Sequence, residues 1–445
     1  MDLTQGNITK QLIEFSLPIF AANILQLLYN TADVIILDRF IGSVGITAAN
    51  IGGQVMLLAT IFSTGLSTGG TVVISQYFGK KDKEGVGRSL FAVFIMCVIL
   101  AVMITGITLA ACTQIISLLN TPSEAVEPAT DYLYFAAFGT IAIFGYNAIC
   151  AAMRGMGDSR SPLYVIGICA AMNIVLDLVL IAHFHMGAGG AAIATSISQA
   201  LSFIIALVIL LRNNKDMGFR LSEWREGFRE IPVIARVGLP SAFQSLSVRI
   251  SMVVVLAIAN LNGSVAAAAF GIGVKLDSYS LLTRQAISAG ITAMVGQNKG
   301  IGNNQRIESA VRTGACINLA QAVVLVTLLQ LFAAPVASIF TKDALVVEEV
   351  VHYIRIAALA YLPMSLMTSY NSLPIGIGFS EYALFNSFLD SILVRIPLCW
   401  LLSIYFGMGM TGLYIGLALS PVAAMITGCL YYHRGNWRDR ILLKK

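Results

Sequence analysis

The sequence predicts an all-α integral membrane protein with twelve transmembrane helices in two pseudo-twofold-related bundles of six. Three observations support this fold class: an apolar composition, long apolar stretches that recur along the chain, and an internal repeat. Of the 445 residues, 57% are hydrophobic and 11% are charged, and the mean hydropathy is +0.81. A soluble domain has about 25% charged residues, so lipid is the expected solvent. The apolar runs are continuous, which favours helices over a β-barrel.

Apolar stretches long enough to cross a hydrocarbon core of about 30 Å recur twelve times. The first stretch follows a short polar start and has the length of a spanning helix. We therefore expect it to be retained rather than cleaved as a leader peptide. The predicted spans are residues 12–36, 46–75, 89–112, 130–152, 162–183, 189–211, 232–260, 265–296, 309–333, 349–375, 383–406 and 410–432.

The positions of the basic residues support this number of spans. With the N-terminus in the cytoplasm, 21 of the 28 basic residues fall on cytoplasmic segments, whereas Arg39 and Lys342 alone fall on the opposite side. Such a bias toward the cytoplasm is typical of membrane proteins. One missed helix would move every later connection to the opposite side of the membrane and destroy the bias. We therefore expect a multi-pass protein of the cell membrane with both termini in the cytoplasm.

The longest polar stretch within the chain, residues 212–230, lies at its midpoint. It indicates an N-lobe of residues 1–211, a cytoplasmic linker of residues 212–231 and a C-lobe of residues 232–445. Trp224 and Phe228 stand among mixed charges in this linker, which favours a short helix on the cytoplasmic membrane face.

The two halves align with each other at an offset of 221 or 222 residues. The matched pairs include Pro18 with Pro240, Gly42 with Gly263, Gly52 with Gly273, Gln76 with Gln297, Gly157 with Gly378, and Gly187 with Gly409. Because each half contains an even number of spans, both halves enter the membrane from the same face. This parallel repeat is typical of secondary transporters that bind substrate between two bundles.

Helix 1 carries a polar stripe within its apolar span. Asn23, Gln26, Asn30 and Asp33 recur at spacings of three or four residues, so they share one helix face. A polar face inside a membrane turns toward the bundle interior, and we expect the three amides to line a substrate cavity. Pro18 lies 15 residues before Asp33 on the same helix. It removes a backbone donor and allows a bend, so we expect a hinge there.

Oxygen-bearing side chains of three helices are expected at a similar depth in the first half. Asp177 and Thr195 lie roughly 9 and 10 Å from the outer ends of helices 5 and 6 at about 1.5 Å per residue. Asp33 lies near the outer end of helix 1, and Asn173 precedes Asp177 by one turn. These oxygens suit Na⁺, a hard cation. They equally suit a proton, because two adjacent buried acids cannot both ionise cheaply. A network that only joins helices is the structural alternative.

The second half carries more charge within its spans. Asp277 and Arg284 are seven residues apart, which places them on one face for pairing, whereas Asp390 and Arg395 are five apart, a poor facing distance in an α-helix. Structural ion pairing is the favoured interpretation. A polar cavity that contacts substrate through Arg249 and Asp277 is the alternative.

Motifs of catalysis or metal binding are missing from the sequence. The seven cysteines form no C-x-x-C pair, the four histidines are scattered, and neither H-E-x-x-H nor G-x-S-x-G occurs. We therefore expect neither an enzyme nor a cofactor, and we expect no nucleic-acid partner. The expected partners are small organic substrates and the lipid bilayer.

These features together resemble the multidrug and toxic compound extrusion (MATE) family over essentially the whole chain. The residues that carry the resemblance are Pro18 to Asp33 on helix 1, Gln76-Tyr77-Phe78-Gly79, Arg154-Gly155-Met156-Gly157-Asp158, Asn173 with Asp177, and Thr195. The resemblance implies a drug/Na⁺ or drug/H⁺ antiporter, with a cation site in the N-lobe. That site falls on Asp33, Asn173, Asp177 and Thr195, and the family's helix-1 proline falls on Pro18.

The sequence departs from one part of the family pattern. Some members carry acids on helices 7 and 10 that bind a cation in the C-lobe. At the matching stretch of helix 7 this chain has Val248 and Arg249, and helix 10 has no acid between Tyr361 and Asn371. A second cation site of that kind is therefore not expected.

The expected function is efflux of small organic molecules, in particular cationic ones, by antiport against Na⁺ or H⁺. The two lobes would expose the substrate to each side of the membrane in turn, and a two-lobed chain can work as a monomer. A lipid or lipid-linked oligosaccharide flippase of the same superfamily is the alternative, and it predicts a strongly basic central cavity. A membrane-embedded enzyme and a sensor without transport are two further hypotheses.

Overall fold

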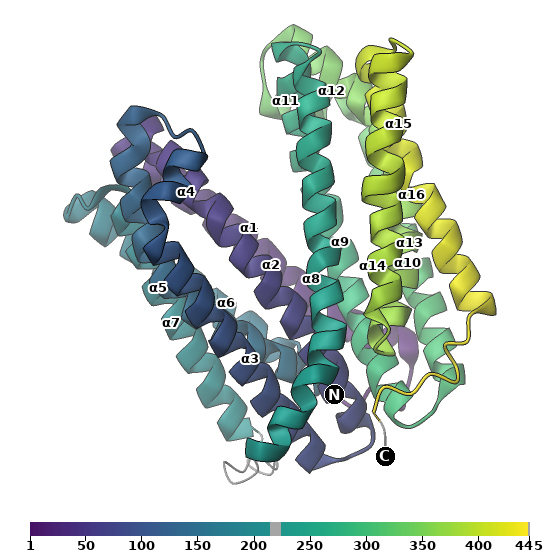
Figure 1. Cartoon of the computed structure of the whole chain (residues 1–445). Helices are drawn as coiled ribbons and strands as arrows, with labels where there is room; N and C mark the ends of the chain where they lie inside the picture. Colours follow the sequence, from purple (N-terminus) through teal and green to yellow (C-terminus); the bar gives the residue numbers. More distant parts are fainter. Residues whose placement is uncertain (214–223, 444–445) are drawn as a thin grey trace. The chain divides into compact units, whose positions relative to one another are not determined.

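The computed structural model describes residues 1–213 and 224–443, which form helices joined by short turns (Figure 1). Within these residues no β-strand is present, and the predicted all-α fold class is confirmed. Most of the predicted linker, residues 214–223, lies outside the described residues. Its described end begins helix α8, where Phe228 packs edge-on against Phe91 with ring centroids 5.9 Å apart.

The first half of the chain folds into long helices that follow the predicted spans. Short connections separate most of them, and α6 continues directly into a π-helical segment. The helices are α1 (Ile8–Ile41), α2 (Ser43–Gly79), α3 (Lys83–Ala110), the short α4 (Cys112–Leu118), α5 (Val126–Gly155), α6 (Arg160–Asp177), its π-helical continuation (Leu178–His183) and α7 (Gly187–Asn213).

The second half repeats this order. Its helices are α8 (Trp224–Asn260), α9 (Ser264–Gly300), α10 (Asn304–Leu331), α11 (Ala333–Phe340), α12 (Ala344–Ile356), a 3-10 turn (Ala357–Ala360), α13 (Tyr361–Gly376), α14 (Ser380–Phe388), a π segment (Leu389–Arg395), α15 (Ile396–Trp400), a second π segment (Leu401–Tyr405) and α16 (Gly409–Arg434).

Local details recur at the offset found in the sequence. Helices α2 and α9 begin after Gly42 and Gly263, whose φ angles of 76° and 99° favour glycine. Asp82 caps α3 by accepting a hydrogen bond from the Gly85 N–H at 2.8 Å, and Asn303 caps α10 in the same way. The repeat is therefore one of backbone geometry as well as of sequence.

Eleven helices in the described part of the chain are long and apolar enough to cross a membrane. The predicted span at residues 349–375 is the remaining one, and it is divided into α12 and α13 by the 3-10 turn Ala357–Ala360. The predicted set of spans is thus reproduced, with one span interrupted rather than continuous.

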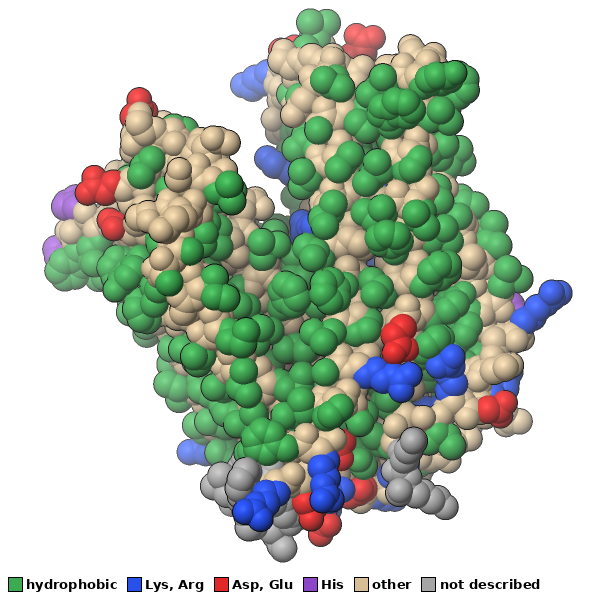
Figure 2. Space-filling model, viewed as in Figure 1, with side chains coloured by type: hydrophobic (Ala, Val, Ile, Leu, Met, Phe, Trp, Pro, Cys, Tyr) green, Lys and Arg blue, Asp and Glu red, His purple; other side chains and the backbone are tan. Residues whose placement is uncertain are grey.

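Apolar side chains cover the flanks of the helices, and charged side chains gather mainly at the helix ends (Figure 2). On α3, for example, Ile99, Val102, Met103 and Ile107 are each more than half exposed. Their spacing places them on one helix face. Such a face is unfavourable in water and suits contact with acyl chains.

The chain divides into two compact units, and two short segments are exchanged between them. The first unit contains Met1–Asp2 and Leu17–Ala242, and the second contains Leu3–Ser16 and Phe243–Lys445. Helices α1 and α8 therefore each contribute to both units. The two boundaries lie beside Pro18 and Pro240, the prolines inside these helices.

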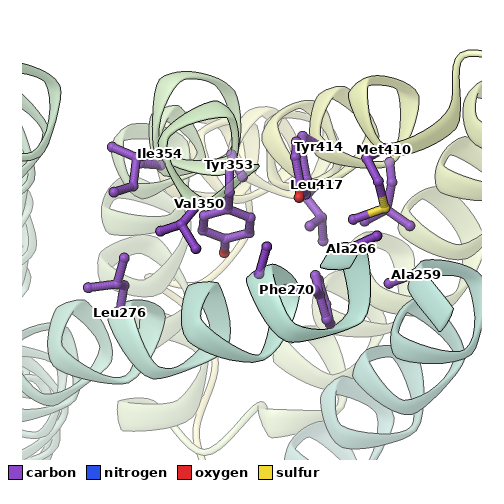
Figure 3. Packing of buried hydrophobic residues seen from close by; sticks show 14 of the residues in the cluster. Ala259, Ala266, Phe270, Leu276, Val350, Tyr353, Ile354, Met410, Tyr414 and Leu417 are labelled. Carbon is purple, nitrogen blue, oxygen red and sulfur yellow. The ribbon is translucent and has the colours of Figure 1, made fainter. Parts of the chain in front are cut away.

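The second unit has an extensive buried core at α8, α9, α12 and α16. Tyr353 of α12 is directed toward α9, near Phe270 and Tyr414 (Figure 3). The Tyr353 and Tyr414 rings meet edge-on at 5.2 Å, a favourable aromatic geometry. This packing fixes the position of the Tyr353 hydroxyl, which donates to a half-buried acid described below.

Candidate functional site

Four of the predicted residues meet inside the first unit. Asn173 and Asp177 of α6 are 2% and 0% exposed, and Thr195 of α7 and Asp33 of α1 are half-buried. The Asn173 Nδ2 donates a long hydrogen bond of 3.5 Å to the Thr195 Oγ1. The carboxyl groups of Asp33 and Asp177 lie within hydrogen-bonding reach of each other. Three helices thus converge on one cluster of oxygens.

Most acceptor oxygens of this cluster have no hydrogen-bond donor directed at them. The Asp33 Oδ1, the Asn173 Oδ1 and both carboxylate oxygens of Asp177 are buried without a hydrogen-bond partner among the described residues. A buried acceptor without a donor costs about 1–3 kcal/mol, and more when it is charged. The arrangement is therefore complementary to a species that brings positive charge, either a metal cation or a proton.

The cluster is poor in the ligands that transition metals prefer. Within the described residues no group of three or more His, Cys, Asp and Glu side chains is arranged to hold a metal ion. Two carboxylates, one amide and one hydroxyl form a set of hard oxygen ligands instead. Such a set fits Na⁺ better than Zn²⁺ or Cu²⁺.

The rest of the α1 stripe does not join this cluster. Gln26 and Asn30 are exposed and Asn23 is half-buried. Gln26 lies within hydrogen-bonding reach of Tyr29, one turn further along α1. The shared helix face therefore brings only Asp33 to the second acid.

Tyr132 of α5 is part of the site and was not predicted. Its ring lies within electrostatic range of both Asp33 and Asp177. The ring packs on α2 at Gly52, where an added Cβ would lie 2.3 Å from the Tyr132 Cδ1. Gly52 is therefore the position that allows Tyr132 to approach the acids. The internal repeat could have identified Tyr132 from the sequence. Gly273 faces Tyr353 in the same way, and the two glycine–tyrosine pairs are related by the offset of 221.

The backbone at Asp177 is also unusual. The α-helical hydrogen-bonding pattern ends there, and the chain continues as a π-helix over Leu178–His183. The matching segment of the second half, Leu401–Tyr405, is π-helical as well. Segments of π-helix are rare and occur often at functional sites.

The acids of the second unit have partners. The Asp277 Oδ1 accepts hydrogen bonds from the hydroxyls of Tyr353 at 2.8 Å and Tyr361 at 2.6 Å. The predicted pairing of Asp277 with Arg284 is not a direct contact, since no ion pair joins them within 4.0 Å in the described residues, although the two side chains lie within electrostatic range of each other. Arg249, the other predicted cavity residue, is exposed on α8.

Asp390 and Arg395 form a buried ion pair of 2.5 Å despite their separation of five residues. The expectation that this spacing is poor for pairing was wrong, because it assumed α-helical geometry. Residues Leu389–Arg395 form a π-helix, in which residues five apart lie one above the other. Nothing in the sequence pattern marks the change of helix type.

Comparison with known proteins gives consistent results. The family model MatE matches residues 18–179 and again residues 240–401. The chain is 27% identical to the probable multidrug resistance protein YpnP of Bacillus subtilis, over 98% of this chain and 97% of that protein. It is 26% identical to the probable multidrug resistance protein NorM of Thermotoga maritima, over 98% and 95%. A solved structure of a multidrug resistance MATE family transporter is similar with a TM-score of 0.90 and 25% identity, over 97% and 96%.

Proposed function

The chain belongs to the MatE family, and on that premise we propose that it exports small organic molecules in exchange for Na⁺ or H⁺ bound at Asp33, Asn173, Asp177 and Thr195. Members of the family are transporters, so the chain is a multi-pass membrane transporter and not an enzyme. Relatives named as multidrug resistance proteins support small organic molecules as the substrate class.

The lack of donors around the two acids is the observation that carries this proposal. Four buried oxygens contributed by Asp33, Asn173 and Asp177 have no hydrogen-bond partner in the described part of the chain. A site with only a structural role would satisfy such groups, because each one left unpaired destabilises the fold. A cation that binds and leaves during each cycle accounts for their retention.

The coupling would act through helix α1. Asp33 and Pro18 lie on this helix, and the boundary between the two units passes between Ser16 and Leu17, beside Pro18. A proline inside a helix removes one backbone hydrogen bond and eases bending. Cation binding at Asp33 would therefore favour one bend of α1, and the bend would be passed to the unit that holds the segment before Pro18. Alternating access would follow from this movement.

The proposed setting is the cell membrane, with both termini in the cytoplasm. The transporter would act as a monomer, because one chain supplies both units. Na⁺ or H⁺ would serve as the coupling ion and no further cofactor would be needed. Nucleic acid has no part in the proposed cycle.

Substrate efflux from proteoliposomes tests this function. A Na⁺ gradient and a pH gradient are imposed separately, and the initial rate of organic dye movement is measured for the wild type and for Asp33→Asn. We expect one of the two gradients to drive transport in the wild type. The variant should lose roughly tenfold or more of the coupled rate, because one of the two charges that hold the cation is gone.

The matched control is Asp38→Asn, which removes an exposed acid from the same helix. It should keep the wild-type rate. Dye movement that ignores both gradients in the wild type would exclude cation antiport. Normal coupled efflux by Asp33→Asn would exclude the assigned site.

A further inference from the structure

Within each unit, equivalent helices make side-chain contacts at equivalent positions. In the first unit, the Thr140 Oγ1 donates to the Met56 Sδ at 3.6 Å. At the repeat-equivalent positions of the second unit, the Tyr361 hydroxyl donates to the Asp277 Oδ1. Both pairs are 84 residues apart in sequence. Equivalent positions therefore have comparable surroundings, and differences in side-chain type between the units are meaningful.

The units differ in charge at this position of α9, where Asp277 replaces Met56, and again two turns further along the same helix face. In the first unit, the Asn147 Nδ2 donates to the Ser63 Oγ at 3.0 Å, again across 84 residues. The repeat offset places Arg284 at the position of Ser63 and Thr368 at that of Asn147. A neutral, hydrogen-bonded pair is thus replaced by a guanidinium on α9.

Arg284 has almost no protein partners. It is 5% exposed, and its Nε donates a long hydrogen bond of 3.4 Å to the Ser280 carbonyl oxygen of its own helix. Among the described residues no hydrogen-bond partner is present for its Nη atoms, and no acid lies within 4.0 Å of it, so Asp277 and Asp390 act on it only over a longer distance. The Oγ of Ser280, one turn earlier and fully buried, also lacks a partner. A guanidinium held inside the protein without a direct ion pair is costly.

The other buried arginine of this unit has a complete set of partners. Arg395 donates through Nη2 to Asp390, through Nε to the Ser420 Oγ at 3.2 Å, and through Nη1 to the Met252 Sδ at 3.8 Å. Its role is therefore structural. The Asp277 Oδ1 is likewise occupied by two tyrosine hydroxyls, so neither Asp277 nor Asp390 forms a direct ion pair with Arg284.

The depth of Arg284 restricts what can reach it. It stands 20 residues after the start of α9 and 16 before its end. At about 1.5 Å per residue, these separations correspond to roughly 30 and 24 Å. Lipid headgroups lie at the edges of a hydrocarbon core of about 30 Å, far from this point. A partner for Arg284 must therefore come through the protein.

We propose that Arg284, assisted by the Ser280 hydroxyl, binds a carboxylate or phosphate group of the transported molecule. This inference rests on the proposed export function and adds a substrate class to it, organic molecules that carry an oxyanion. The planar guanidinium presents its Nη donors in a fork that matches two oxygens of such a group. The coupling cation and the oxyanion are then held by different units, at the acid pair and at Arg284.

Equilibrium binding to the purified full-length protein tests the proposal independently of transport. The probes are a xanthene dye as its ethyl ester, which lacks a carboxylate, and as its free acid, and binding is followed by fluorescence anisotropy. We expect the wild type to bind the acid more tightly than the ester. In Arg284→Gln the affinity for the acid should fall roughly tenfold to hundredfold, while that for the ester stays unchanged.

Two further variants separate recognition from folding. Arg284→Lys keeps the charge but loses the fork, so it should recover only part of the preference for the acid. The double variant Arg284→Ser with Thr368→Asn copies the Ser63 and Asn147 pair that the first unit already accommodates. It should therefore fold, and it should show no preference for the acid.

The same titrations with added inorganic phosphate identify the source of the oxyanion. Weak competition at millimolar phosphate supports an organic substrate. Displacement of the acid by micromolar phosphate would overturn the assignment in favour of a free inorganic anion. Equal affinities for ester and acid in the wild type would also overturn it, as would an equal loss for both probes in Arg284→Gln. A preference for the acid without gradient-driven efflux would leave the anion site intact and refute antiport instead.

Discussion

Replacing Asp177 with asparagine should stabilise the protein while it abolishes coupled transport. The carboxylate of Asp177 is fully buried, faces the carboxyl group of Asp33, and has two oxygens without a hydrogen-bond partner in the described residues. An amide of the same shape removes one negative charge and introduces an N–H group. That group can donate to the Asp33 Oδ1, which also lacks a partner in the described part of the chain.

The size of the stabilisation follows from the number of unpaired buried acceptors that the substitution pairs or removes. Each buried acceptor left unpaired costs about 1–3 kcal/mol, and the substitution pairs one acceptor of Asp33 and removes one of Asp177. We therefore expect an increase of about 2 kcal/mol or more in the free energy of unfolding in Na⁺-free buffer at alkaline pH. A ligand at about 100 times its Kd stabilises by about 2.7 kcal/mol. Saturation with the coupling ion should stabilise the wild type by a similar amount. It should thus erase the difference in the free energy of unfolding between the wild type and the variant.

Thermal unfolding of the detergent-solubilised protein measures this prediction. The apparent midpoint is recorded for the wild type, Asp177→Asn and the exposed control Asp38→Asn, with Na⁺ absent or saturating and at alkaline or acidic pH. The Asp177 variant should unfold at a higher temperature than the wild type only when the coupling ion is absent. A lower midpoint for this variant under those conditions would refute the view that the two acids lack a stabilising partner when the coupling ion is absent.

Three further predictions follow from the packing. Gly52→Val should displace the Tyr132 ring, since even a Cβ would lie 2.3 Å from its Cδ1; we expect a loss of about 1–3 kcal/mol in stability with a large loss of coupled efflux, and an unchanged efflux rate would contradict the role of the ring. Arg395→Met should destabilise by about 3–5 kcal/mol, because it leaves Asp390 buried without its ion-pair partner; adding Asp390→Leu should restore the thermal midpoint. Pro18→Ala should keep the wild-type midpoint but slow efflux, because it restores a backbone donor beside the point where α1 changes from the second unit to the first. Full efflux would argue against a hinge.

The sequence predicted four residues of the site and missed a fifth. Asp33, Asn173, Asp177 and Thr195 were predicted from their spacing on three helices, and the structure brings them together. Tyr132 was missed, since it contributes through its contact with another helix and not through a pattern on its own. Whether these residues bind the coupling ion remains a prediction.

The charged residues of the second half were harder to interpret. Asp277 and Arg284 stand at a spacing that suits pairing in an α-helix, yet the tyrosines of α12 and α13 take the carboxylate instead. Asp390 and Arg395 stand at a spacing that does not suit an α-helix, yet a π-helical segment pairs them. Side-chain spacing predicts contacts only when the helix type and the neighbouring helices are known.

The amino-acid sequence was enough to predict the solvent, the helices, the repeat and the family of this protein. Lipid excludes other folds for long apolar runs, and a duplicated half leaves a regular offset in glycines and prolines. Three features emerged only from the packed helices: residues 3–16 belong to the second unit, Tyr132 reaches the acids, and Arg284 forms no direct ion pair within 4.0 Å in the described part of the chain. Hydropathy and periodicity are properties of single helices, whereas partner choice depends on helix rotation and register, which are set by the side chains of several helices packing together.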